Sequence, residues 1–207
     1  ADDLQAIRPQ VLVAVPRIFE RVYDRMQAQL ADAPAFKRKL FELAVDSGWQ
    51  AFLARQGRGR LSLKRYLFAP LRKRIATSLM AKLGNNLQLA ISGGAALPQP
   101  VARVFLGLGL NLIQGYGMTE SAPVVCANRS DNNDPASVGS PLEGIEVRIG
   151  ENDELQVKSP GVMLGYWNNH KATREVMTRD GWLRTGDKAR IERGQVYITG
   201  RIKDILV

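Results

Sequence analysis

The stretch LQLAISGGAALPQPVARVFLGLGLNLIQGYGMTE, residues 87–120, decides the fold of this chain. It contains two short apolar runs, 87–91 and 111–114, and a helical pattern between them over about 98–106. Strand, helix and strand in this order are typical of a parallel sheet. We therefore expect an α/β fold that includes a segment of parallel sheet.

The chain before this stretch has the pattern of helices. Apolar residues recur at helical spacing from Ile18 to Leu30, after a proline, Pro16, that suits a first helical turn. A second helical pattern covers 35–55, a Gly/Arg-rich break covers 56–60, and the main body of a third helix covers 70–84. Residues 1–84 are thus predicted to be mainly helical.

The chain after this stretch changes to a β pattern near residue 138. One short helix is expected at 168–177. Strands are expected at 144–149, 154–158, 187–191, 195–199 and 202–207. Together they predict a small antiparallel sheet or barrel behind the parallel-sheet segment.

Positive charge is concentrated in the first 84 residues, which hold 16 Lys and Arg against 7 Asp and Glu in a chain of net charge +9. No acidic residue lies between Asp46 and Glu120. Eight cations crowd into 55–74, together with nearby aromatic residues: Arg55, Arg58, Arg60, Lys64, Arg65, Arg72, Lys73 and Arg74. This stretch should attract anions such as nucleic acid, an anionic lipid surface or coenzyme phosphates. A solvated helical face is the alternative interpretation.

Composition excludes several classes of protein. No apolar run reaches the length of a membrane-spanning helix, and no signal-peptide pattern opens the sequence, so a cytoplasmic setting is expected. The single cysteine, Cys126, has no disulfide partner, and with one histidine, His170, a Cys/His zinc cage cannot form.

Three Gly-rich segments, 92–96, 115–120 and 185–187, each follow a predicted strand. Loops at the carboxyl ends of parallel strands bind ligands in open sheets. In the second segment Tyr116 can stack on a flat ring, Thr119 can donate to a phosphate oxygen, and Glu120 can hold magnesium. A tight turn with no ligand is the alternative.

Six motifs in order carry a resemblance to a known family. They are SGGAALP (92–98), QGYGMTE (114–120), VGSPLEG (138–144), GVMLGYW (161–167), DGWLRTGD (180–187) and GRIKDI (200–205). This series resembles that of the adenylate-forming superfamily of acyl-CoA synthetases. VPRIFE (15–20), followed by a long helical insertion, resembles the long-chain fatty acyl-CoA synthetases in particular.

The resemblance implies a role for each matching residue. Gly93, Gly94 and Ala95 would form a backbone wall beside adenine and the acyl pocket. Tyr116 would stack on the adenine, within a nucleotide-binding loop that also includes Gln114, Gly115 and Gly117. Thr119 would contact the α-phosphate, and Glu120 would bind Mg²⁺. Asp187 would accept hydrogen bonds from the ribose, with Arg201 beside the same sugar, and Lys203 would lie at the hinge to a C-terminal domain.

The resemblance also implies the reaction, the co-substrates and the organisation of the chain. ATP with Mg²⁺ would activate a fatty acid, and coenzyme A would accept the acyl group. The chain would comprise a basic helical segment (1–84), an α/β nucleotide-site segment (85–137), an antiparallel β subdomain (138–201) and the start of the hinge (202–207). The family's phosphate loop and C-terminal domain are not in this sequence, which therefore resembles an internal fragment of a large N-terminal domain.

Competing functions are less consistent with the sequence. Ser92 lacks the Gly-x-Ser-x-Gly elbow of a serine hydrolase, and Leu112 stands where a dinucleotide-binding loop needs its third glycine. A basic nucleic-acid-binding module and another ligase of the same superfamily are the alternatives. We expect no nucleic-acid partner, and we expect peripheral association of the basic stretch with anionic membrane.

Overall fold

The computed structural model describes residues 2–59 and 68–203 and divides into two compact units, each with its own apolar core. Unit 1 comprises Ala1–Ile113 and Ser130–Pro135. Unit 2 comprises Gln114–Arg129 and Ala136–Val207. The α/β fold class predicted from the sequence is confirmed, whereas the predicted four-part division of the chain stays a prediction.

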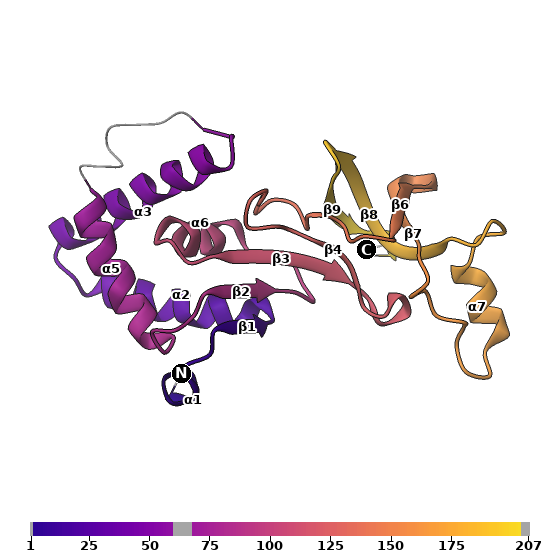
Figure 1. The fold of residues 1–207 in the computed structure, drawn as a ribbon, viewed down its shortest axis with the longest axis horizontal. Coiled ribbons are helices and arrows are strands. Elements are labelled where there is room, and N and C mark those ends of the chain that lie inside the picture. Colours follow the sequence, from indigo (N-terminus) through magenta and orange to yellow (C-terminus); the bar gives the residue numbers. More distant parts are fainter. Residues whose placement is uncertain (1, 60–67, 204–207) are drawn as a thin grey trace. The chain divides into compact units, whose positions relative to one another are not determined.

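Unit 1 is mainly helical, as predicted (Figure 1). Its elements are α1 (Asp2–Ile7), β1 (Val11–Ala14), α2 (Pro16–Ala31), α3 (Ala35–Arg55), α5 (Ala69–Lys82), β2 (Leu89–Ser92) and α6 (Gln99–Gly107). The helices expected at 16–30, 35–55, 70–84 and 98–106 are confirmed to within two residues at each end. The break expected at 56–60 is described only as far as residue 59.

The core of unit 1 joins these helices to a parallel strand pair. The ring of Phe19 on α2 packs edge-on against that of Phe105 on α6, with ring centroids 5.8 Å apart, and both side chains are buried. β1 pairs with β2 in parallel, with Val11 opposite Leu89. The predicted parallel-sheet segment is therefore confirmed, and its parallel pair includes a strand, β1, that the sequence had not indicated.

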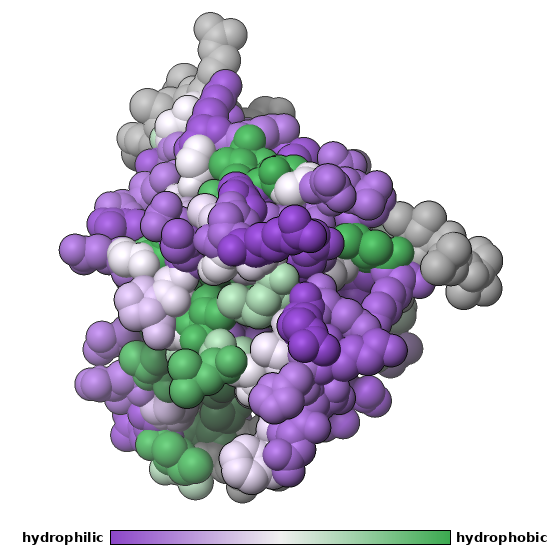
Figure 2. All heavy atoms as spheres, turned by 90° about the vertical axis from the view of Figure 1, so that its right-hand side faces the viewer, coloured by the Kyte–Doolittle hydropathy of each residue, from purple (hydrophilic) through white to green (hydrophobic). Residues whose placement is uncertain are grey.

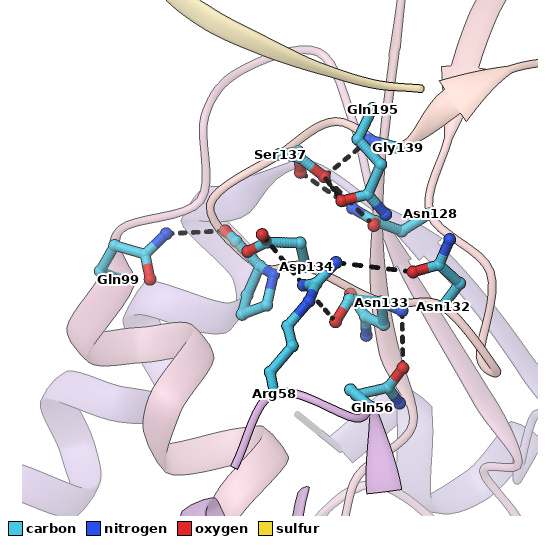
Figure 3. Close-up of polar contacts among 11 residues, drawn as sticks. Gln56, Arg58, Gln99, Asn128, Asn132, Asn133, Asp134, Ser137, Gly139 and Gln195 are labelled. Carbon is cyan, nitrogen blue, oxygen red and sulfur yellow. Dashed lines mark hydrogen bonds and ion pairs between the residues drawn. The ribbon is translucent and has the colours of Figure 1, made fainter. Parts of the chain in front are cut away.

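Polar side chains just after α3 and at the start of α6 hold the segment Ser130–Pro135 within unit 1 (Figure 3). Nη1 of Arg58 lies 2.9 Å from Oδ2 of Asp134, and the Asn133 amide N–H donates to Oε1 of Gln56 over 2.8 Å. The Gln99 side chain donates to the carbonyl of Pro135 over 2.7 Å. Arg58, predicted as part of a cationic surface, is thus engaged in an ion pair.

Unit 2 contains a four-stranded antiparallel sheet, which confirms the predicted β pattern of this part of the chain. β3 (Leu112–Gly117) starts in unit 1 and ends in unit 2, where it pairs with β4 (Val124–Ala127), and β4 pairs with β5 (Ser140–Pro141). The four-stranded sheet has the order β6 (Glu146–Ile149), β7 (Glu154–Lys158), β8 (Leu183–Glu192), β9 (Gln195–Arg201). Two 3₁₀ turns, η1 (Thr119–Ser121) and η2 (Glu151–Asp153), and the helix α7 (His170–Val176) complete the unit.

The structure corrects two predicted turns and one predicted strand. Residues 115–117 belong to β3 rather than to a loop, because β4 supplies them with antiparallel backbone partners. A Cβ at Gly117 would collide with the carbonyl of Pro123, so this close approach requires glycine. Residues 185–187 lie inside β8, where Gly186 has a φ of 74°. Ile202 and Lys203 are not in a strand, and 204–207 lie outside the described residues.

Arg148 on β6 holds the turn that precedes β8. Its guanidinium binds both carboxylate oxygens of Asp180, at 2.7 and 3.1 Å, and lies over the ring of Trp182 with 4.3 Å to the centroid. The pKa of the Asp180 carboxyl is lowered, chiefly by the hydrogen bonds from Arg148. This contact fixes the start of the DGWLRTGD motif.

Among the described residues, no helix combines the length and apolar character needed to cross a bilayer.

Candidate nucleotide site

Three of the residues singled out from the sequence meet in unit 2. The hydroxyl of Tyr116 on β3 donates to Oδ2 of Asp187 on β8 over 2.6 Å. Nε of Arg201, at the end of β9, donates to Oδ1 of the same carboxylate over 3.0 Å. The Asp187 side chain is only 11% exposed, whereas that of Arg201 is 70% exposed. The largely buried carboxylate of Asp187 therefore lies between the Tyr116 side chain and the exposed guanidinium of Arg201.

Asp187 is held in place by its own strand and by β7. The Thr185 hydroxyl donates to the carbonyl of Leu155 over 2.8 Å and accepts from the Asp187 amide over 3.1 Å. The Gly186 amide donates to Oε1 of Glu154 over 3.1 Å. These contacts use every residue of the Thr-Gly-Asp segment, so the strand geometry orients the carboxylate.

Burial controls the ionisation of the groups beside Asp187. The pKa of the Tyr116 phenol is raised above its usual value, first by burial and then by its hydrogen bond to Asp187. Burial raises the pKa of the neighbouring Cys126 thiol to about 12. Both groups are therefore neutral near pH 7, and Tyr116 acts as a hydrogen-bond donor.

The Met-Thr-Glu turn follows β3 directly. Ser121 closes η1 with a buried hydroxyl that lies 2.9 Å from the carbonyl oxygen of Met118 and 3.0 Å from that of Pro123. Thr119 is exposed, and Glu120 is partly buried. The turn thus presents a hydroxyl and a carboxylate in succession at the end of the strand.

Glu120 is tied to the 161–167 segment, a contact that sequence reasoning missed. The Tyr166 hydroxyl donates to Oε1 of Glu120 over 2.8 Å, and the Met163 amide donates to the Glu120 carbonyl over 2.8 Å. The hydrogen bond to Glu120 is the main cause of the raised pKa of Tyr166. The motif GVMLGYW was visible in the sequence, but nothing local links it to a residue 46 positions earlier.

The 161–167 segment also carries exposed apolar side chains. Leu164 is fully exposed, and Trp167 is 91% exposed. Figure 2 shows hydrophobic side chains gathered in the lower part of the face that carries α7. The Thr173 hydroxyl on α7 accepts from the Tyr166 amide over 2.9 Å, which places Tyr166 against this helix.

A buried polar cluster holds the VGSP segment against β9 (Figure 3). The Asn128 amide group donates to the carbonyl of Ser137 over 2.8 Å, and the Ser137 hydroxyl accepts from the Gly139 amide over 3.1 Å. The same hydroxyl lies 3.4 Å from Oε1 of Gln195 on β9. Since all these polar groups are buried, the cluster fixes the backbone that runs beside the site.

The remaining residues singled out from the sequence lie as follows. Gly93, Gly94 and Ala95 belong to unit 1, in the loop after β2, and the Gly93 amide donates to the Ala14 carbonyl over 3.2 Å. Gln114 and Gly115 lie in β3, where the Gln114 carbonyl accepts from the Asn128 amide over 2.8 Å. Lys203, the residue expected at the hinge, is exposed.

The donor set fits a nucleotide with its metal ion. An ionised carboxylate offers about four acceptor positions. Asp187 therefore retains capacity for sugar hydroxyls beside its bonds to Tyr116 and Arg201. Mg²⁺ usually takes one or two protein carboxylates and completes its shell with phosphates and water, so Glu120 alone fits that role.

Comparison with known proteins agrees with this fold and its motifs. The chain is 36% identical over 207 residues to the long-chain-fatty-acid–CoA ligase FadD15 of Mycobacterium bovis, covering 99% of this chain and 34% of the relative. It is 29% identical over 253 residues to a chloroplastic long-chain-fatty-acid–[acyl-carrier-protein] ligase of Arabidopsis thaliana, covering 100% of this chain and 35% of the relative. The chain thus spans about a third of the length of these curated relatives.

A solved structure gives the same result for the fold. A malonyl-CoA ligase, in a ternary product complex with methylmalonyl-CoA and AMP, has a TM-score of 0.59 and 27% identity. The match covers 93% of this chain and 34% of that one.

These likenesses define the fold as that of the adenylate-forming ligases. The profile of the family described as AMP-binding enzyme matches residues 1–167. The chain belongs to the AMP-binding enzyme family.

Proposed function

We propose that the protein carrying this chain activates a long-chain fatty acid with ATP and transfers the acyl group to coenzyme A. The observation that carries the proposal is the hydrogen-bonded Tyr116–Asp187–Arg201 cluster in a member of the AMP-binding enzyme family. The names of the relatives support the fatty acid as substrate. The fatty carboxylate attacks the α-phosphate of ATP to give an acyl-adenylate and pyrophosphate, and the CoA thiol then displaces AMP.

The contribution of the chain to this reaction is positioning and neutralisation of charge. Tyr116 provides a ring face for adenine while its hydroxyl stays on Asp187. Asp187 accepts from the ribose hydroxyls, and Arg201 supplies a cation beside the same sugar. Thr119 donates to the α-phosphate, and Glu120 would hold Mg²⁺, which offsets the phosphate charge when bound. Gly93, Gly94 and Ala95 contribute backbone beside adenine and the acyl group.

Two substitutions in the full-length protein test these roles. We expect Glu120→Gln and Thr119→Val to slow fatty-acid-dependent exchange of pyrophosphate into ATP by about 100-fold. Thr119 is exposed, and the new amide oxygen in Glu120→Gln can still accept from Tyr166, so the free energy of unfolding should change by less than about 0.5 kcal/mol. Glu143→Gln is the matched control, since Glu143 is exposed and lies outside the site. Exchange rates unchanged in both site variants would refute the assignment.

The acyl acceptor has one named alternative. One relative is a ligase for acyl-carrier-protein rather than for coenzyme A. Thioester formation should therefore be assayed with coenzyme A and with a holo-acyl-carrier-protein in parallel. Transfer only to the carrier protein would retain the adenylation step and reject coenzyme A as acceptor.

We also propose that the basic stretch of unit 1 contacts anionic membrane. Arg60, Lys64 and Arg65 lie outside the described residues, and Arg58 is paired with Asp134. The proposal therefore rests on the cations at both sides of that gap, Arg55, Arg72, Lys73 and Arg74. Each basic residue near an anionic surface contributes about 1 kcal/mol. Co-sedimentation with acidic liposomes should fall as salt rises, and salt-independent binding would contradict the proposal.

A further inference from the structure

A groove with a volume of about 520 Å³ runs between α2, α3 and α5 in unit 1. Leu79 at its floor is buried, and Leu71 and Ile75 line it from the same helix. Phe36 and Leu40 on α3 line the opposite side and are 62% and 38% exposed. The groove thus exposes apolar side chains whose burial by a ligand would be favourable. Its volume lies within the range of roughly 300–1,000 Å³ that is usual for small-molecule sites.

Every charged side chain that lines this groove among the described residues is a cation. These residues are Lys37 on α3 and Arg74 and Lys82 on α5. Nζ of Lys82 donates to Oε1 of Gln29 on α2 over 3.1 Å, which holds its charge beside the groove. An apolar floor with a cationic rim favours a ligand that is apolar along its length and anionic at one end.

A second groove in unit 1 has a different charge pattern. It lies between α2, α3 and α6, with a volume of about 710 Å³. Its lining includes the acids Glu42 and Asp46 as well as Arg38 and Arg103, and Arg103 pairs with Asp46 over 2.8 Å. Its charges compensate one another, so it offers no preference for an anion.

We propose that the groove between α2, α3 and α5 binds a long-chain carboxylate. The hydrocarbon chain lies along Leu71, Ile75 and Leu79, and the carboxylate faces the cations of the rim. None of the residues assigned to the nucleotide site lines this groove. The groove therefore gives unit 1 a binding site for a carboxylate of the same chemical class as the proposed substrate. The three helices that form it hold none of the residues of the proposed nucleotide site.

Photolabelling of the full-length protein tests this site. The probe is a palmitic acid analogue with a diazirine in its chain, irradiated without ATP and without vesicles, and labelled peptides are identified by mass spectrometry. We expect label on peptides of α2, α3 and α5. Palmitate should compete with the probe at least about tenfold better than octanoate, because each buried methylene strengthens binding.

Charge reversal at the rim has a matched control. Lys37→Glu with Arg74→Glu should lower labelling of the three helices about tenfold, since both cations face the carboxylate. Lys39→Glu with Lys73→Glu makes the same change in net charge on the same two helices, at exposed positions that do not line the groove. Labelling in that control should stay unchanged.

Three outcomes would overturn the proposal. They are an equal loss of label in both double variants, competition that ignores chain length, and label on these helices only when anionic vesicles are added. The last outcome would identify a membrane contact instead. Because labelling is measured without ATP, it is independent of whether the protein forms an acyl-adenylate, and failure of either proposal can be recognised separately.

Discussion

The Tyr116 hydroxyl donates to Oδ2 of Asp187 over 2.6 Å, so the proposed adenine contact and the proposed ribose contact share one hydrogen bond. The second oxygen of the carboxylate accepts from Arg201 over 3.0 Å. A change at Asp187 therefore alters the ring on one side and the guanidinium on the other. The two ends of a bound adenosine would be recognised by one connected group of side chains rather than by independent contacts.

Removing the Tyr116 hydroxyl tests this coupling. Tyr116→Phe keeps the ring but leaves Oδ2 of Asp187 without its donor, so the free energy of unfolding should fall by about 1–2 kcal/mol. AMP affinity, measured by calorimetry, should fall by about three- to tenfold because Asp187 is less well oriented. Tyr23→Phe in unit 1 is the control. Unchanged AMP affinity in Tyr116→Phe would show that the two contacts act independently.

The raised pKa of Tyr116 predicts an alkaline loss of stability. The folded protein binds the phenol proton more tightly than the unfolded chain, whose tyrosine pKa is 10.0. This contribution is complete below pH 10 and is lost as pH rises above it, because only the unfolded chain ionises there. The stability difference between wild type and Tyr116→Phe should shrink by about 1.4 kcal/mol per pH unit above 10. Urea unfolding at pH 9, 10 and 11 measures it, and parallel curves would contradict the prediction.

Elements whose bounds are set by residues close together in the sequence were predicted well. The helix Ala35–Arg55 was expected at these bounds because its helical pattern and the Gly/Arg-rich break that follows it are both local features of the sequence. Thr185-Gly186-Asp187 was expected as a turn, since Gly-Asp is typical of turns. In the structure these residues lie inside β8, which pairs with β7 on one side and β9 on the other. The pairing with β7 joins segments that are distant in the sequence, so the local pattern does not predict it.

Sequence distance likewise separates the site residues that could be chosen from the sequence from the site contacts that could not. Tyr116, Asp187 and Arg201 could be chosen because each lies in a recognisable motif, and the structure brings them together. Tyr166 could not be assigned to Glu120, because the hydrogen bond joins residues 46 positions apart. Arg58 and Asp134 are still farther apart in the sequence, so their ion pair could not be predicted. Arg58 was therefore assigned to the cationic surface alone.

The buried thiol of Cys126 should resist modification. Its side chain is fully buried, and burial raises its pKa to about 12, so thiolate is scarce at pH 8. We expect Cys126, followed by mass spectrometry of its peptide, to stay unmodified by Ellman's reagent in the native protein at pH 8 over an hour, and to react after unfolding in urea. Rapid reaction of the native protein would show that β4 opens readily or is less covered than described.

Two serines offer a matched test of hydroxyl satisfaction. The Ser121 hydroxyl contacts the carbonyls of Met118 and Pro123, so Ser121→Ala should cost about 1–2 kcal/mol of unfolding free energy. The Ser92 hydroxyl is buried and has no hydrogen-bond partner among the described residues. Ser92→Ala should therefore be neutral or stabilising. Chemical denaturation measures the unfolding free energy of both variants. A larger loss of unfolding free energy in Ser92→Ala than in Ser121→Ala would refute the distinction.

With Glu120 as the proposed Mg²⁺ ligand, the hydrogen bond from Tyr166 to Glu120 should set the magnesium dependence of the proposed pyrophosphate exchange. Tyr166→Phe removes a donor to a charged oxygen, so the Glu120 carboxylate loses its fixed orientation while its charge remains. In the full-length protein we expect the Mg²⁺ concentration for half-maximal pyrophosphate exchange to rise about five- to tenfold. Because Tyr166 is partly exposed, the free energy of unfolding should change by less than about 0.5 kcal/mol. Trp167→Phe, which alters an exposed neighbouring ring, should leave the magnesium response unchanged. If Tyr166→Phe instead lowers stability and maximal rate together at an unchanged magnesium response, Tyr166 holds the 161–167 segment in place and does not orient the carboxylate.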